Sequence, residues 1–172
     1  MNFGGENIAA CIVEPIAGST GTLVPPKGYL KRLREICDKH GILLIFDEVI
    51  TGWGRTGSKF GAHEFGVTPD IMTMAKATTN GVVPMGVVAC NDYIYDAVMD
   101  SSPMGSVELF HGYTYSGIPV AVAAALAVQD IFEKEDIFNR AKDMSPYLQD
   151  GLQSLKDLKE VVSIRGYGMM GG

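Results

Sequence analysis

The chain has 172 residues, of which 47% are hydrophobic and 20% charged, and its formal net charge is −6. This composition is typical of one α/β unit with a sizeable core, and the acidic balance without a basic cluster argues against nucleic acid as a partner. The longest apolar stretch, Ile118 to Val128, is too short for a membrane span, and no charged leader precedes an apolar segment, so we expect a cytoplasmic protein.

Short apolar runs alternate with helical patterns from the start of the chain. Ile8 to Val13 is an apolar run that stops before Pro15, and because proline excludes a helical continuation, the run predicts a strand. Apolar residues recur at helical spacing from Tyr29 to Cys37, and that helix is expected to end near Gly41. The next run, Ile42 to Phe46, completes a strand–helix–strand unit, which we expect to be right-handed and parallel.

The same alternation continues toward the C-terminus. A glycine-rich loop, Thr51 to Gly57, leads to a short stretch around Phe60 to Phe65 and then to a further apolar run, Ile71 to Ala75, which predicts a strand. The other predicted elements are a strand within Val82 to Cys90, a helix from Asp92 to Met99 capped by Asn91 or Asp92, a long functional loop from Ser101 to Tyr115, an alanine-rich helix capped by Ser116 and reaching Phe132, an amphipathic segment from Ile137 to Leu158, and a strand starting over Val161 to Ile164.

Two of the predicted strands end in charged residues. Asp47 and Glu48 follow one apolar run, and Lys76 follows another. Because the carboxyl ends of parallel strands face one crevice, we expect Asp47 and Lys76 to share a pocket. Apolar surroundings favour neutral lysine and can lower its pKa to roughly 7–8. Neutral lysine attacks aldehydes, while an ionised carboxylate can hold a protonated ring nitrogen.

Each of these side chains also has a purely structural interpretation. A lysine near the end of a strand is commonly a solvated edge charge, and an aspartate there can cap a turn. A carboxylate after an apolar run is nevertheless costly to bury without a cation or several hydrogen-bond donors, and a ring N–H is such a partner. We interpret Glu48 as a residue that forms a salt bridge or anchors a loop rather than as a catalytic residue.

The two charged strand ends lie within longer motifs. These are LLIFDEVITGWGRTG and PDIMTMAKATTNGVVPMG, preceded by EPIAGSTGTLVPPKGYLKRLREICDKHG. Together they resemble the class III pyridoxal-phosphate aminotransferases, and most of all the ω-amino acid:pyruvate branch. The resemblance extends from about Ile8 to Gly172. It implies an α/β fold, the fold-type-I large domain with a mostly parallel sheet flanked by helices, of which this chain is a central fragment.

The resemblance also implies a domain division and roles for three residues. Residues 1–135 would form the central part of the cofactor-binding large domain, and residues 136–172 a connecting helix and the start of an incomplete small domain. Lys76 would be the Schiff-base lysine and proton shuttle, and Asp47 the partner of the ring nitrogen of pyridoxal 5'-phosphate. Val49 would pack against one face of the ring, although its plain interpretation is a core valine.

Two further residues bear on assembly and specificity. Thr114 lies in the segment HGYTYSG before a predicted helix, where the residue type alone suggests a turn, while the free N–H groups of the helix favour phosphate. In the family the matching threonine binds the cofactor phosphate of the neighbouring subunit, which implies a homodimer. Some relatives that act on γ- or δ-amino substrates carry glutamate where this chain has Ser19, which favours the pyruvate-dependent branch.

The function implied is transfer of an amino group from an ω-amino acid or amine to pyruvate. Two alternatives stay open: another class III reaction such as an aminomutase, and a catalytically incomplete fragment that acts only as a folding or interaction unit. Neither of two GxGxxG matches, at 52–57 and 166–171, has the strand-to-helix context of a dinucleotide site. The three histidines lack metal-ligand spacing, and the three cysteines are expected to be reduced.

Overall fold

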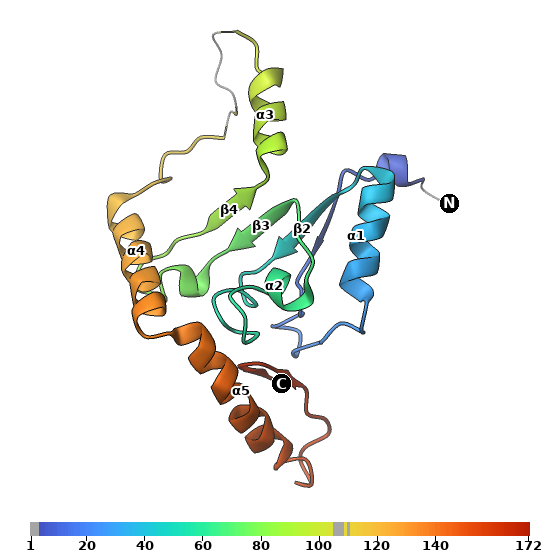
Figure 1. Cartoon of the computed structure of the whole chain (residues 1–172), viewed down its shortest axis with the longest axis vertical. Helices are drawn as coiled ribbons and strands as arrows, with labels where there is room; N and C mark the ends of the chain where they lie inside the picture. Colours follow the sequence, from blue (N-terminus) through green and yellow to red (C-terminus); the bar gives the residue numbers. More distant parts are fainter. Residues whose placement is uncertain (1–3, 105–108, 110) are drawn as a thin grey trace.

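The computed structural model describes residues 4–104, 109 and 111–172, and its centre is a four-stranded sheet in the order β1-β2-β3-β4 (Figure 1). The strands are β1 (Ala10–Val13), β2 (Leu43–Asp47), β3 (Ile71–Met74) and β4 (Val87–Cys90). The pairs β1/β2 and β2/β3 are parallel, whereas β4 runs antiparallel to β3. The prediction of a mostly parallel sheet is therefore confirmed.

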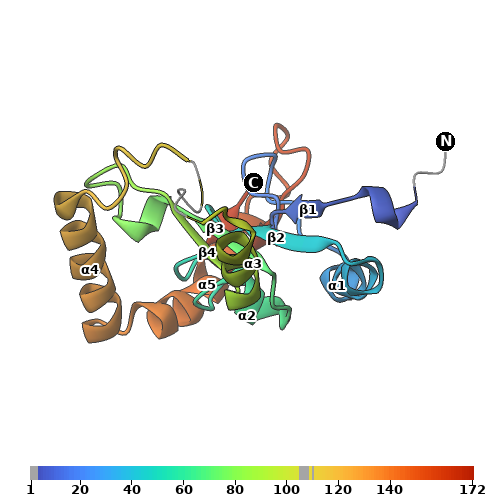
Figure 2. The same cartoon turned by 90° about the horizontal axis from the view of Figure 1, so that it is seen from above.

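Helices connect these strands and continue beyond them. They are η1 (Gly5–Asn7), α1 (Tyr29–His40), α2 (Gly61–Phe65), η2 (Lys76–Thr78), α3 (Asp92–Ser101), α4 (Pro119–Lys134) and α5 (Ile137–Gln153), followed by a hairpin of β5 (Gly166–Tyr167) and β6 (Met170–Gly171). Figures 1 and 2 show α4 beyond the β4 edge of the sheet, with α5 continuing from it. Within the described residues, no helix combines the length and hydropathy needed to cross a membrane.

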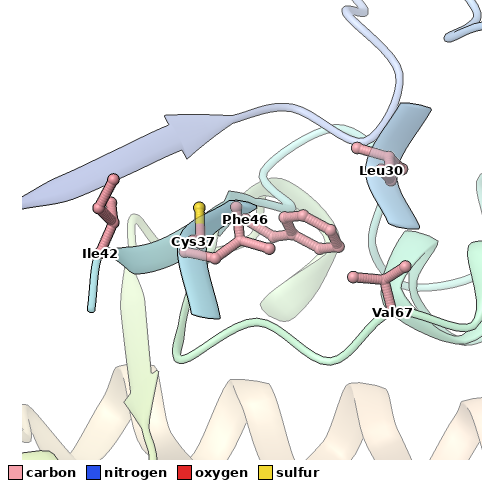
Figure 3. Packing of buried hydrophobic residues seen from close by; sticks show 6 residues of the cluster. Leu30, Cys37, Ile42, Phe46 and Val67 are labelled. Atoms are coloured by element: carbon pink, nitrogen blue, oxygen red, sulfur yellow. The ribbon is translucent and has the colours of Figure 1, made fainter. Parts of the chain in front are cut away.

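The hydrophobic core lies on one face of the sheet. Strand residues alternate between two faces, and in β2 the side chains of Leu44 and Phe46 are fully buried against α1 and α2. Figure 3 shows Phe46 between Leu30 and Cys37 of α1 and Val67, which follows α2. The opposite face is open, because Ile12 of β1 is 63% exposed. A sheet of this kind, covered on one face only, is unusual for parallel strands, which are normally buried on both faces.

Two boundaries differ from the predictions. Helix α4 begins at Pro119 with Ile118 as its N-cap, because proline is favourable at the first helical position, whereas Ser116 lies in a turn and donates its N–H to the carbonyl of Tyr113. Residues 161–164 form no strand in the described chain. The hairpin begins at Gly166 instead, next to a backbone pair between Arg165 and Gly172.

The C-terminal hairpin packs on the glycine-rich loop after β2. Gly168 has a φ of 58°, and a Cβ at this position would lie 2.5 Å from the carbonyl oxygen of Arg55 and 2.7 Å from the carbonyl carbon of Thr56. The Tyr167 hydroxyl donates to Glu64 of α2, and burial together with this hydrogen bond raises the pKa of Tyr167 to about 12. The two GxGxxG segments therefore meet each other at Gly168, and close packing explains this glycine. The division at residues 135 and 136 stays a prediction.

Asp70 lies directly before β3, at the end of the sheet opposite to the charged strand ends, and it joins β3 to three other elements. Its carboxylate accepts hydrogen bonds from the N–H of Leu44 at 2.6 Å, from Arg34 of α1 at 2.8 Å and from the hydroxyl of Tyr93 of α3 at 2.9 Å. Burial alone would raise the pKa of Asp70, but the three hydrogen bonds outweigh it and hold the pKa below its usual value. Asp70 therefore stabilises the fold in its ionised form.

Asp70→Asn is expected to lower the free energy of unfolding by about 1–3 kcal/mol at pH 7, because it removes a charged acceptor from three donors. Since the folded pKa of Asp70 lies below the unfolded value, its contribution is fully present above about pH 4 and is lost as pH falls through the folded pKa. Urea unfolding of both proteins between pH 3 and 7 measures this difference. The control is Asp157→Asn, at an exposed position. An equal, pH-independent loss of unfolding free energy in both variants would contradict the prediction.

Candidate functional site

The candidate site lies where β2 and β3 end, on the open face of the sheet. The parallel register pairs Asp47 with Thr73, and the chain then runs through Ala75 to Lys76, the first residue of η2. The backbone N–H of Glu48 donates to the carbonyl of Thr73, so the register persists to the last residue of the strand pair. The structure thus brings Asp47 and the Lys76 turn to one edge of the sheet.

Strand alternation determines which face Asp47 occupies. Because Phe46 points into the core, Asp47 points to the opposite face, together with Ile45 and the paired Thr73. Asp47 is half-buried, and its Oδ1 accepts the N–H of Val49 at 3.0 Å. Within the described residues no donor reaches its other carboxylate oxygen, which therefore retains the capacity to accept a hydrogen bond from a ligand.

Glu48 has a different role from its neighbour. It is fully buried, and it accepts hydrogen bonds from the hydroxyl of Thr51 at 2.5 Å and from the N–H groups of Gly61 and Ala62 at 2.8 and 2.7 Å. These donors belong to the loop after β2 and to the first residues of α2. Glu48 therefore anchors the loop, which is one of the two roles predicted for it. The other role, a salt bridge, is not observed, because no cation pairs with Glu48 in the described part of the chain.

Lys76 follows β3 in a left-handed backbone conformation. Its φ is 44°, which an L-residue other than glycine rarely adopts and which costs about 1–3 kcal/mol. Such strain persists only where surrounding contacts hold it, and it is concentrated at functional sites. The Lys76 residue is exposed, so the predicted desolvation by apolar neighbours is wrong for this structure. The physical reason is that the open face of the sheet has no covering layer.

The turn after Lys76 is fastened by two buried threonine hydroxyls. Thr78 accepts the indole N–H of Trp53 at 3.0 Å and donates to the carbonyl of Ala75 at 2.9 Å. Thr79 donates to the carbonyl of Val83 at 2.5 Å. The sequence alone does not indicate these partners, because the indole belongs to the loop after β2, 25 residues earlier in the chain than Thr78.

The two other predicted site residues lie on separate elements. Val49 is half-buried beside Asp47, to which its N–H donates. Thr114 is exposed in the turn that precedes α4, and its N–H donates to the carbonyl of Gly112 at 2.5 Å. A cavity of about 510 Å³ separates the start of α4 from the loop before β4, and Tyr115 and Ser116 line it. The roles of Val49 and Thr114 toward a ring and a phosphate stay predictions.

The chemistry of these side chains fits pyridoxal phosphate. Asp47 offers an unused carboxylate oxygen at a half-buried position, as a protonated ring nitrogen requires. Lys76 offers an amine at the adjacent strand end, as the aldehyde of the cofactor requires. The described residues contain no group of His, Cys, Asp or Glu side chains arranged to hold a metal ion.

Comparison with known proteins identifies relatives of the whole chain. Residues 2–172 match the family model described as aminotransferase class-III. The chain is 58% identical over 167 residues to an omega-aminotransferase of Caulobacter vibrioides and 54% identical over 167 residues to an omega-amino acid–pyruvate aminotransferase of Pseudomonas putida. The matches cover 97% and 96% of this chain but only 38% and 37% of those relatives. The chain therefore spans little more than a third of their length.

A solved structure agrees with this result. The (S)-enantioselective omega-transaminase from Thermomicrobium roseum superposes with a TM-score of 0.91 at 44% sequence identity. The superposition covers 98% of this chain and 37% of that protein. The fold described above is therefore that of the corresponding part of this transaminase.

Proposed function

This chain belongs to the class-III aminotransferases, and from that membership we propose that it carries the reactive lysine and the ring-nitrogen partner of a pyridoxal-phosphate-dependent transaminase. The reaction is the transfer of an amino group from an ω-amino acid or amine to pyruvate, as the names of two similar proteins describe for those proteins. The observation that carries the proposal is the parallel register of β2 and β3, which places Asp47 and the Lys76 turn at one sheet edge.

Each residue has a distinct task in this proposal. The amine of Lys76 would hold pyridoxal phosphate at its aldehyde carbon, and it would be the group that moves a proton at the substrate carbon. Positioned proton transfer of this kind contributes about 10²–10⁴-fold to a rate. Asp47 would hold a proton on the ring nitrogen, and Val49 would pack against the ring. When bound, pyridoxal phosphate supplies the electron sink that stabilises the substrate carbanion.

The proposed assembly is a homodimer in which Thr114 contributes to the phosphate site of the neighbouring subunit. Its support is the exposure of Thr114 and of large apolar side chains on α4, among them Val120 and Leu126, which are 61% and 62% exposed. Apolar surface of this kind is favourably covered by another protein surface. We place the protein in the cytoplasm, which is supported by its acidic composition and by the absence of a disulfide among its three cysteines.

Nitrogen-15 tracing tests the proposed reaction and separates it from the two alternatives. The chain is incubated with pyridoxal phosphate, pyruvate and an ω-amino acid labelled at the amino group, and the products are analysed by mass spectrometry. The proposal predicts labelled alanine. An aminomutase would leave alanine unlabelled while moving the label within its own substrate. A catalytically incomplete chain would form an adduct at Lys76 and transfer nothing, and either result would overturn the proposed reaction.

A further inference from the structure

The strained turn at Lys76 needs a group that holds it, and the structure contains one. After β3 the backbone enters the left-handed region at Lys76, with a φ of 44°. The carbonyl of Ala75, directly before this residue, accepts two hydrogen bonds from Thr78, one from its hydroxyl and one from its N–H, both at 2.9 Å. A turn fastened at both sides of Lys76 fixes the direction in which the lysine side chain leaves the strand.

Thr78 is in turn held by Trp53. Its hydroxyl is 3.0 Å from the indole nitrogen of Trp53, so it accepts one hydrogen bond and donates the other. Thr78 is 2% exposed, which excludes water as an easy substitute for either partner. The indole itself is fixed by ring contacts with Phe60 and with Phe132 of α4, at centroid distances of 5.0 and 5.9 Å.

We infer that the relay from Trp53 through the Thr78 hydroxyl to the Ala75 carbonyl is the positioning device for Lys76. It keeps the lysine backbone left-handed and so aims the amine from the strand end. The relay joins three separate segments, the loop after β2, η2 and, through Phe132, helix α4. The inference rests on the proposed function only in taking Lys76 as the reactive amine.

The chemistry of the two side chains makes the inference specific. Phenylalanine in place of Trp53 keeps a ring for packing but has no N–H to donate, so the Thr78 hydroxyl loses one partner. Valine in place of Thr78 keeps the branched shape but has no hydroxyl. The indole N–H then loses its acceptor, and the Ala75 carbonyl loses one of its two hydrogen bonds. Serine at the same position keeps the hydroxyl. A positioning role therefore predicts that serine rescues what valine loses.

Nuclear magnetic resonance on the labelled chain without cofactor tests the turn directly. Hydrogen exchange of the Thr78 amide reports the turn, because this amide donates to Ala75, and the backbone shifts of Lys76 report its left-handed conformation. Thr78→Val and Trp53→Phe are expected to accelerate that exchange about tenfold, the order expected when one buried hydrogen bond is lost, and to shift Lys76 away from positive φ. Thr78→Ser and the control Thr56→Val, at a buried threonine outside the relay, are expected to leave both the Thr78 exchange rate and the Lys76 shifts unchanged.

A second readout connects the turn to the reactive amine. The chain is treated with pyridoxal phosphate and borohydride, and peptide mapping measures the share of label on Lys76 relative to the other lysines. The relay predicts that this share falls about tenfold in Thr78→Val and Trp53→Phe.

The outcomes separate this inference from the proposed function. Unchanged exchange and unchanged Lys76 shifts in Thr78→Val and Trp53→Phe overturn the inference, whatever the labelling shows. An equal change in Thr56→Val also overturns it, because the effect would then be a general loss of stability. Label spread evenly over the lysines of the unaltered chain overturns the proposed function instead, while the exchange data still decide whether the relay holds Lys76.

Discussion

Lys76→Ala is expected to abolish amino transfer, with a fall of at least about 10²–10⁴-fold in the rate of the first half-reaction. The variant lacks both the amine that binds the cofactor and the group that moves the proton. Because Lys76 is exposed and alanine meets the same left-handed backbone as lysine does, we expect the variant to keep the fold. Rapid mixing with an ω-amino acid, with the same excess of pyridoxal phosphate present for each protein, measures the rate.

The matched control for this prediction is a lysine outside the site. Lys156 is exposed in the segment after α5, and Lys156→Ala removes the same charge. We expect its rate to equal that of the unaltered protein. A Lys76→Ala variant that still transfers amino groups at the rate of the control would show that another residue carries the reaction.

Asp47→Asn is expected to keep the fold and the cofactor but to slow transfer by about 10²–10³-fold, the order found when one preorganised electrostatic partner is removed. Asparagine has the shape of aspartate, and its amide oxygen still accepts the N–H of Val49. It carries no charge, however, and therefore no longer stabilises a proton on the ring nitrogen. Cofactor affinity and half-reaction rate, measured on the same sample, separate binding from chemistry.

The neighbouring carboxylate supplies the control. Glu48→Gln also replaces a carboxylate by an amide, but Glu48 accepts from Thr51, Gly61 and Ala62 and anchors a loop. We expect this variant to lower the free energy of unfolding by about 1–3 kcal/mol and to leave the spectrum of the bound cofactor unchanged. If Asp47→Asn transferred amino groups as fast as the unaltered protein, the assignment of Asp47 to the ring nitrogen would be wrong.

The sequence is sufficient to predict the mostly parallel sheet and the edge at which Asp47 and Lys76 lie. Apolar runs of parallel strands are distinctive, and the first charged residue after such a run must lie at the carboxyl edge of the sheet. Asp47 and Lys76 follow two consecutive parallel strands, so the sequence alone brought them to one edge. Helix α1 was equally clear, because its apolar period ends at Gly41, which has a φ of 65°.

The remaining features depend on contacts between distant segments. Strand β4 runs antiparallel to β3 after a turn in which the Thr79 hydroxyl donates to the carbonyl of Val83, and the relay between Trp53 and Thr78 joins the loop after β2 to η2. Lys76 is more exposed than predicted. The apolar residues before it indicate a buried strand, but they do not indicate which face of that strand is covered. The N-cap of helix α4 lies two residues after the predicted Ser116, because serine is a common cap but Pro119 is favourable at the first helical position.

One measurement tests the central claim, that Lys76 is the amine that binds pyridoxal phosphate. The absorbance spectrum of the purified chain with added pyridoxal phosphate is recorded before and after dialysis, beside Lys76→Ala, and both samples are then reduced with borohydride for peptide mapping. The claim predicts a signal that survives dialysis, is absent from the variant and maps to Lys76. Equal, dialysable signals from both proteins, with label spread over many lysines, would contradict it.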